Sequence, residues 1–353
     1  MQLCKIFDIS LPLIQSPMAG AQDSELCIAV SEAGGLGSLP CAMLSSEEID
    51  EEVKKIREKT DKPFNLNFFC HADLPFSEEK ERIWRQKLAP YYKEFEIDPP
   101  KVAATMGRQP FSQKSLDIVK RLKPAALSFH FGLPDANLWD QVKASGIKTM
   151  SSATTRDEAL WLESQGVDVI IAQGLEAGGH RGHFLSHDLT LQKDMGTLLK
   201  QILEVVKIPV VAAGGIFDGI SVKSAINIGA AGVQVGTSYL LCNESKISHL
   251  HRGALKSLLA SETQLTNLFS GRPARGLKNR LMKECGPISD QVPNFPMAGT
   301  ATQGLKKIAE SKGSVDFSSL WSGTNNHGCR EISADEMTKS LSKHLDLGSQ
   351  NAT

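Results

Sequence analysis

Eight short apolar runs, rich in β-branched residues, recur between Leu11 and about Thr237 and constrain the fold more than any other feature. They read LPLIQSPM, LGSLP, FNLNFF, AALSFH, KTMSSAT, DVIIAQG, PVVAAGG and GVQVGT. Segments with helical spacing, such as 155–166 and 219–230, alternate with them. This alternation indicates a parallel sheet covered by helices, and eight units favour an α/β fold of the TIM (β/α)8 barrel type. A ninth run, KVAATMG at 101–107, is interpreted as an extra strand or loop segment.

The alternation ends after Glu244, where the chain becomes rich in Gly, Pro and Asn. We therefore expect a barrel over 1–244 and a mostly helical lid or substrate domain over 245–328, because helices joined by irregular loops suit a lid over the barrel mouth. Ser333 followed by Glu336 forms a capping-box pattern, which predicts a last helix within 329–353 that packs back on the barrel.

The composition excludes several classes of protein. The 39 basic and 40 acidic side chains nearly cancel, so nothing in the overall charge favours nucleic acid or an anionic membrane as a partner. The seven cysteines are odd in number and form no C-x-x-C motif, which disfavours a disulfide framework or a zinc site. No window approaches the roughly twenty apolar residues that span a bilayer. We expect a cytoplasmic protein, and the sequence leaves a homodimer open.

In a TIM barrel, the residues at the carboxyl ends of the strands carry the chemistry. Here they are Met18, Ala19, Gly20, Asn67, His130, Gln173, Gly174, Gly214, Gly215, Gly236 and Thr237. The set holds no lysine for a Schiff base, and Glu176 is the sole nearby carboxylate, which disfavours a metal site. Amide, imidazole and glycine suit a planar, hydrogen-bonding cofactor that the backbone approaches closely. The glycines after the last two strands lie where such barrels commonly hold a phosphate, although a simple turn would also use them.

The loop QGLEAGGHRGH, at 173–183, supplies the first candidate for catalysis. His180 follows two glycines and precedes Arg181, so its ring can approach a ligand and stay partly charged near an anion. Arg181 can pair with a substrate carboxylate or with Glu176, and we favour the salt bridge to Glu176.

Three further histidines carry weaker signals. His130 lies in ALSFH and is either a second catalytic residue or a core histidine bonded to a backbone carbonyl. His180, His183 and His187 could be considered as metal ligands, but a glycine-rich loop does not fix three rings on one face. We therefore expect no metal, and we expect His183 and His187 to lie in solvent.

Several blocks of the sequence resemble the class I nitronate monooxygenases, formerly called 2-nitropropane dioxygenases. These blocks include QSPMAG, FNLNFFCH, AQGLEAGGHRG, AAGGIFDG and VGTSYLLCNES. The resemblance is strong from Leu13 to Ser245 and looser beyond. It implies a TIM barrel that binds FMN without a metal. It also implies oxidation of alkyl nitronates, such as propionate 3-nitronate, by O2 to a carbonyl compound and nitrite.

The resemblance also implies roles for individual residues. Met18 and Asn67 would lie along the isoalloxazine ring, Gln173 and Gly178 would contact the flavin, and His180 and His130 would flank the substrate. The phosphate would be held by Gly214, Gly215, Gly236 and Thr237. The sequence departs from the family pattern in the segment PNFPMAGTATQG, where two tyrosines and a lysine are replaced by Phe295, Gly299 and Gln303. This departure affects the expected substrate pocket and leaves the FMN motifs intact.

Two other functions stay open at this point. The first keeps FMN but transfers hydride from NAD(P)H to an enoyl thioester or quinone, because related flavin enzymes share shorter forms of the same motifs. The second is a flavin-free phosphate-binding isomerase barrel or a non-catalytic nucleotide-binding protein.

Overall fold

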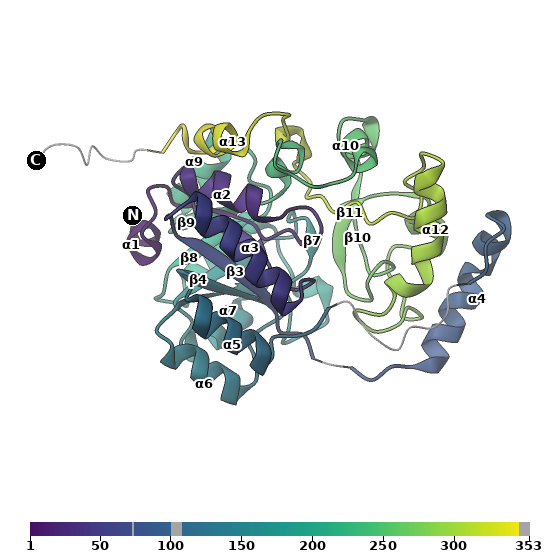
Figure 1. Cartoon of the computed structure of the whole chain (residues 1–353), viewed down its shortest axis with the longest axis horizontal. Helices are drawn as coiled ribbons and strands as arrows, with labels where there is room; N and C mark the ends of the chain where they lie inside the picture. Colours follow the sequence, from purple (N-terminus) through teal and green to yellow (C-terminus); the bar gives the residue numbers. More distant parts are fainter. Residues whose placement is uncertain (73, 100–107, 346–353) are drawn as a thin grey trace, which may run out of the picture.

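A computed structural model describes residues 1–72, 74–99 and 108–345 of the chain. Each of the eight expected runs forms a strand of one parallel sheet, in the order β1-β9-β8-β6-β5-β4-β3-β2 (Figure 1). The strands are β1 (Leu13–Gln15), β2 (Gly37–Pro40), β3 (Phe64–Phe69), β4 (Ala126–His130), β5 (Lys148–Ala153), β6 (Val169–Gln173), β8 (Val210–Ala213) and β9 (Gly232–Val235). A bridge between Ile14 and Leu36 joins β1 to β2 and closes the barrel. The predicted TIM barrel is confirmed, whereas the ninth run at 101–107 lies outside the described residues.

Helices follow the strands and cover the outside of the barrel. They are α2 (Ser24–Glu32), α3 (Ser46–Lys59), α5 (Gln113–Leu122), α6 (Ala136–Ala144), α7 (Arg156–Ser164), α8 (Met195–Leu203) and α9 (Gly219–Ile228). Local sequence explains where several of them begin. Ser45 and Glu48 form a capping box at the start of α3, and Thr155 accepts a hydrogen bond from the backbone of Glu158 at the start of α7. Short 3-10 turns occur at Leu189–Leu191, Thr237–Leu241, Leu258–Ser261 and Asn326–Gly328.

The amino-terminal end of the barrel is closed by α1 (Gln2–Phe7). Leu3 and Phe7 of this helix are buried in one apolar cluster with Ile14, Met150 and Val211 from the strands. Because this end is filled with apolar side chains, the carboxyl ends of the strands are the end available for chemistry.

A second group of elements lies beside the barrel, at the right of Figure 1. It contains α10 (His249–Leu255), β10 (Thr263–Thr266), β11 (Ala274–Leu277), α11 (Arg280–Cys285) and α12 (Gly299–Ser311). The sequence did not predict the β10–β11 hairpin. This hairpin forms a small sheet with the loop that follows β6, because β11 pairs antiparallel with β7 (Gly179–His180) in that loop.

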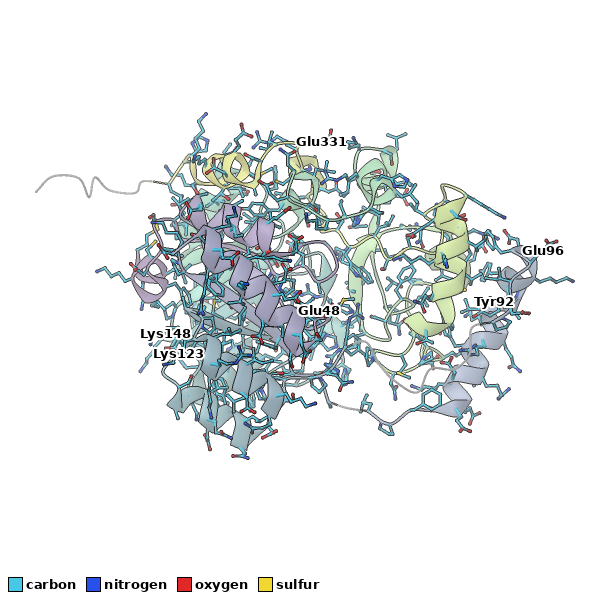
Figure 2. The ribbon with its side chains drawn as sticks, in the orientation of Figure 1. Glu48, Tyr92, Glu96, Lys123, Lys148 and Glu331 are labelled. Atoms are coloured by element: carbon cyan, nitrogen blue, oxygen red, sulfur yellow. The ribbon has the colours of Figure 1, made fainter. Side chains whose placement is uncertain are left out.

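The helix α4 (Glu78–Glu94), inserted after β3, packs with this second group rather than with the barrel. Trp84 and Leu88 share an apolar cluster with Leu305 of α12. The Tyr92 hydroxyl donates to the backbone oxygen of Ala301 at 2.6 Å (Figure 2). Residues before 244 therefore contribute to both groups, and the division of the chain at 244 and 328 stays a prediction.

The last helix, α13 (Ala334–Ser342), begins at the capping box of Ser333 and Glu336 and packs against α2 and α9. All seven cysteines are free thiols. Among the residues described, the structure contains no helix with the length and apolar character needed to cross a membrane.

Candidate active site

A cavity of about 520 Å³ lies at the carboxyl ends of the strands, between the barrel and the second group of elements. Its volume is in the range of small-molecule binding sites. All ten residues predicted to bind a cofactor or substrate line it: Met18, Asn67, His130, Gln173, Gly178, His180, Gly214, Gly215, Gly236 and Thr237. The structure therefore brings the predicted site residues together. The role of each residue toward a ligand stays a prediction.

The glycines on one side of the cavity let two chain segments approach closely. Gly214 and Gly215 have φ values of 112° and 72°, which favour glycine. A Cβ atom on Gly214 would lie 3.0 Å from the backbone nitrogen of Ala177, and one on Gly236 would lie 3.6 Å from the sulfur of Met18. The backbone of Gly214, Gly215 and Gly236 therefore forms this wall of the cavity, which we call the cradle. A larger side chain at any of these positions would collide with neighbouring atoms or occupy the cavity.

The cradle has a second wall that the sequence analysis missed. The backbone N–H of Gly323 donates to Thr237 Oγ1 at 2.9 Å, and Asn325 Nδ2 donates to the backbone oxygen of Gly215 at 2.7 Å. A Cβ atom on Gly178 would lie 2.5 Å from the Gly323 nitrogen. Because Gly323 and Asn325 lie 86 and 110 residues beyond Thr237 and Gly215, no local pattern could have indicated these contacts.

One hydrogen-bond acceptor in the cavity wall has no partner in the described part of the protein. Oε1 of Gln234, on β9, is buried and has no hydrogen-bond partner among the described residues, although the side chain lines the cavity. A buried acceptor of this kind normally has a partner, so a ligand N–H suits this position. The amide of Gln173 is used differently. Its Nε2 donates to the backbone oxygen of His180 at 2.9 Å, and its Oε1 accepts from Gly182 N–H at 2.8 Å.

His180 is held by one hydrogen bond that defines its ring chemistry. Its Nε2 lies 2.8 Å from Ser270 Oγ, whose own hydrogen points to the backbone oxygen of Arg272 at 3.2 Å. Nε2 therefore donates to Ser270, which leaves the lone pair on Nδ1. No hydrogen bond among the described residues uses Nδ1. Burial, followed by the charge of Arg108, lowers the pKa of His180 well below its usual value. The ring is neutral at pH 7, and its Nδ1 can accept a proton.

His130 has both ring nitrogens committed to the protein. Its Nε2 lies 3.1 Å from the backbone oxygen of His180, and its Nδ1 lies 3.1 Å from Ser152 Oγ. Since a carbonyl only accepts, Nε2 donates and Nδ1 accepts from Ser152. Burial lowers the pKa of His130 to about 4. The sequence analysis left open that His130 is a core histidine bonded to a backbone carbonyl, and the structure shows such a bond.

Aromatic rings enclose His180. The ring centres of Phe295 and Trp321 lie 5.4 Å and 5.5 Å from that of His180, and those of Phe131 and Phe69 lie 6.0 Å and 6.3 Å away. The guanidinium carbon of Arg108 lies 5.7 Å from the centre of the Phe295 ring, and Arg108 lines the cavity. The end of the cavity at His180 is therefore largely apolar, with a cation at its wall.

None of the three residues that depart from the family pattern is among the residues that line the cavity. Phe295 is buried behind the cavity wall, with its ring centre 5.4 Å from that of His180, whereas Gly299 and Gln303 lie on α12. A Cβ atom on Gly299 would lie 2.9 Å from the backbone oxygen of Phe269. The packing of α12 therefore explains glycine at 299.

Two expectations about the loop are wrong. Arg181 does not pair with Glu176. It is fully buried, and its guanidinium donates to Gln192 Oε1 and to the backbone oxygens of Gln173 and Gly174, each at 2.7 Å. His183 is 1% exposed rather than solvated, and burial lowers its pKa to about 3. The loop folds back on the end of β6, and the backbone N–H of Arg181 donates to the oxygen of Pro273 at 2.9 Å, so the loop is less open than its local sequence suggests.

The histidines of this loop are the candidate metal ligands of the sequence. His187 is exposed, and its ring lies 5.5 Å from that of His183. Among residues 1–72, 74–99 and 108–345, no group of three His, Cys, Asp or Glu side chains is arranged to hold a metal ion.

Comparison with known proteins gives consistent matches over almost the whole chain. A family model described as "Nitronate monooxygenase" matches residues 1–344. The nitronate monooxygenase of Pseudomonas aeruginosa is 37% identical over 343 residues, which cover 97% of this chain and 98% of the relative. A probable nitronate monooxygenase of Staphylococcus saprophyticus is 35% identical over 97% of this chain and 96% of the relative.

Solved structures agree with these matches. The nitroalkane oxidase of Streptomyces ansochromogenes superposes with a TM-score of 0.88 at 34% identity, over 98% of both chains. FabK of Thermotoga maritima superposes with a TM-score of 0.72 at 23% identity, over 97% of this chain and 95% of that one. At this lower identity the likeness to FabK concerns the fold alone.

Proposed function

The chain belongs to the nitronate monooxygenase family, and on that basis we propose that it oxidises alkyl nitronates with O2 to a carbonyl compound and nitrite. Propionate 3-nitronate is one such substrate. The observation that carries the proposal most directly is the position of His180 in the cavity. Its neutral ring and its free Nδ1 lie in the same cavity as a backbone cradle suited to a phosphate.

We propose FMN as the cofactor, and the glycine-lined part of the cavity supports this proposal. We assign its phosphate to Gly214, Gly215, Gly236 and Thr237, where glycine leaves room for backbone donors. We assign its ring to the part of the cavity lined by Met18, Asn67, Gln173 and Gly178, near the unpartnered acceptor of Gln234. When bound, FMN supplies the electron-accepting chemistry that O2 completes, and the protein positions the substrate against it.

We assign His180 the role of a base that acts on neutral nitroalkanes. Its Nδ1 removes the proton from the carbon next to the nitro group, while Ser270 holds Nε2–H. A nitronate has already lost this proton, so it needs no base. Because burial keeps His180 and His130 neutral, the positive charge that complements the nitronate comes from Arg108 at the cavity wall.

His130 acts on the site indirectly. Its Nε2 holds the backbone oxygen of His180, and Gln173 donates to that same oxygen. We therefore assign His130 a positioning role, in which it fixes the backbone of the residue that contacts the substrate.

Other aspects of the function rest on general chemistry. O2 is the proposed oxidant because nitronate oxidation to nitrite requires one. Seven free thiols favour a reducing compartment, and we propose the cytoplasm. A homodimer is compatible with this function and stays a proposal.

A turnover assay tests the proposed function. The purified protein is mixed with propionate 3-nitronate or ethyl nitronate in air-saturated buffer, and nitrite release and O2 uptake are measured together. We expect nitrite to form in proportion to the O2 consumed. Turnover of neither nitronate by flavin-containing protein would contradict the proposal.

A further inference from the structure

Two aromatic rings form part of the cavity wall next to His180. The side chains of Phe69 and Trp321 line the cavity, and their ring centres lie 6.3 Å and 5.5 Å from that of His180. We call these two rings the aromatic wall. The roles proposed above concern the proton, the nitronate group and the cofactor, and none of them gives the carbon chain of the substrate a partner. A substituent on the carbon that reacts beside His180 has the aromatic wall as its neighbour.

Packing holds both rings of the aromatic wall in place. The Phe69 ring meets that of Phe131 edge-on, with the centres 5.0 Å apart. The Trp321 ring meets that of Phe269 in the same way at 5.9 Å. Trp321 also packs against β11, because a Cβ atom on Gly276 would lie 3.1 Å from Cε3 of its indole. A preformed aromatic surface of this kind binds an apolar group without first losing side-chain entropy.

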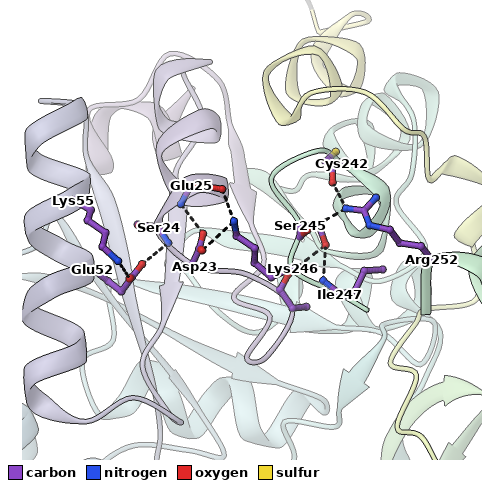
Figure 3. Close-up of polar contacts among 11 residues, drawn as sticks. Asp23, Ser24, Glu25, Glu52, Lys55, Cys242, Ser245, Lys246, Ile247 and Arg252 are labelled. Atoms are coloured by element: carbon purple, nitrogen blue, oxygen red, sulfur yellow. Dashed lines mark hydrogen bonds and ion pairs between the residues drawn. The ribbon is translucent and has the colours of Figure 1, made fainter. Parts of the chain in front are cut away.

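Both lysines of the cavity are already paired with carboxylates of the protein. Among the described residues, the charged side chains that line the cavity are Arg108, Glu176, Lys246, Lys306 and Glu310. Lys246 forms ion pairs with Asp23 and Glu25, at the start of α2 (Figure 3). Lys306 Nζ lies 3.9 Å from a carboxylate oxygen of Glu310. A second anionic group on a substrate would therefore compete with these carboxylates for a lysine.

The two remaining charged groups leave one cation for the substrate. Glu176 Oε2 accepts from the backbone N–H of Met195 at 2.9 Å. Arg108 has no acidic partner among the described residues, and its guanidinium carbon lies 5.7 Å from the centre of the Phe295 ring. This cation is assigned to the nitronate group above. A charged substituent on the same substrate would then lack a partner of its own, which makes its burial unfavourable.

We propose that the aromatic wall of Phe69 and Trp321 binds an aryl or other large apolar substituent on the substrate. The preferred substrates are then nitronates with a single negative charge and an apolar group near the nitrogen. They rank above propionate 3-nitronate, whose carboxylate is a second charge. This inference rests on the proposed function, because it places the nitronate group beside His180 and Arg108.

Equilibrium binding tests the inference without turnover. Carboxylates mimic the planar anionic nitronate, so 3-phenylpropanoate, butanoate and succinate stand for substrates that end in an aryl group, a methyl group and a carboxylate. Their dissociation constants are measured by calorimetry on FMN-loaded protein. We expect 3-phenylpropanoate to bind about tenfold more tightly than butanoate, and succinate to bind more weakly than butanoate. Equal binding of all three, or tightest binding of succinate, would overturn the inference.

Two variants assign the preference to the aromatic wall. Phe69→Leu and Trp321→Leu each keep an apolar side chain but remove an aromatic face. Each should therefore reduce the preference for 3-phenylpropanoate over butanoate by about three- to tenfold. Phe76→Leu is the control, because Phe76 is exposed and does not line the cavity, and it should keep the preference. An unchanged preference in both Phe69→Leu and Trp321→Leu would refute the assignment.

Turnover separates this inference from the proposed function. The anion of 2-phenylnitroethane and propionate 3-nitronate are compared by the kcat/KM for nitrite release. We expect a preference of about tenfold for the aryl nitronate, in line with the binding comparison. Turnover of both with a preference for propionate 3-nitronate would contradict the inference and leave the proposed function intact. Turnover of neither would contradict the proposed function, and the binding comparison would still decide whether the aromatic wall holds an aryl group.

Discussion

The Nε2 atom of His180 lies 2.8 Å from the Oγ atom of Ser270, across ninety residues of sequence. This contact fixes the imidazole from one side and leaves Nδ1 free. It joins the barrel loop to the β10–β11 hairpin region, so the second group of elements completes the site that the barrel begins.

Replacing His180 separates its two candidate roles. We expect His180→Ala to abolish nearly all activity on neutral nitroalkanes, because no base remains. Activity on pre-formed nitronates should fall by about tenfold or less, since a neutral imidazole contributes at most one ordinary hydrogen bond. Steady-state kinetics on both substrate forms, at equal FMN content, check this. Equal, small losses on the two forms would mean that His180 is structural.

Ser270→Ala removes the acceptor of Nε2–H without touching the substrate. We expect kcat on neutral nitroalkanes to fall by roughly three- to tenfold, because the ring loses the contact that selects its tautomer. Turnover of pre-formed nitronates should hardly change. Ser261→Ala, at an exposed position, is the control. A variant that behaves like its control would rule out the assigned tautomer.

Thr237→Asp tests the phosphate cradle. The carboxylate can still accept from Gly323, but its charge would oppose the phosphate in a site with little water, so we expect folded, colourless protein. Thr237→Ser keeps the acceptor and should retain FMN. Gly215→Asp should also be colourless, although its φ of 72° adds backbone strain. Stoichiometric FMN in both aspartate variants would refute the cradle.

Phe295→Tyr restores one phenol next to His180. We expect kcat/KM for small nitronates to rise about three- to tenfold relative to branched ones, because the hydroxyl donates to the anion and takes up space. FMN content should not change. Gly299→Tyr is a poor test, since its Cβ would lie 2.9 Å from the Phe269 oxygen. An unchanged ratio of kcat/KM values in Phe295→Tyr would show that position 295 does not set substrate range.

Buried neutral histidines should make the protein sensitive to acid. Burial lowers the pKa from 6.5 to about 4 in His130 and to about 3 in His183. The unfolded chain therefore binds more protons than the native state below pH 6.5, so the free energy of unfolding falls as the pH is lowered. His183→Leu should reduce this fall by roughly 1–2 kcal/mol between pH 6.5 and 5. Urea unfolding against pH measures it, with exposed His187→Leu as the control. Parallel pH curves for both variants would contradict the account.

The barrel could be predicted from the sequence because each strand carries its own signal. The runs VIIA, before Gln173 in β6, and VVAA, in β8, are apolar along their whole length, as strands buried on both faces must be. The ten predicted site residues could be placed together for the same reason, since they follow those strands. The signal is local in both cases.

The surroundings of those residues could not be predicted. Ser270, Trp321 and Gly323 reach the site through pairing and packing that no local pattern records. Arg181 and His183 are buried although the local sequence presents an open loop, and burial also keeps His180 neutral. The sequence therefore indicates which residues meet, whereas their charge state follows from what covers them.

Anaerobic mixing tests the central claim most directly. Purified protein is mixed without O2 with ethyl nitronate and, in a second experiment, with NADH, while the visible absorption of the flavin is followed. The account predicts a flavin spectrum that bleaches with the nitronate and stays unchanged with NADH over the same time. Rapid bleaching by NADH without any change on adding nitronate would contradict it and would favour a reductase, and a colourless protein that FMN cannot reconstitute would exclude both flavin functions.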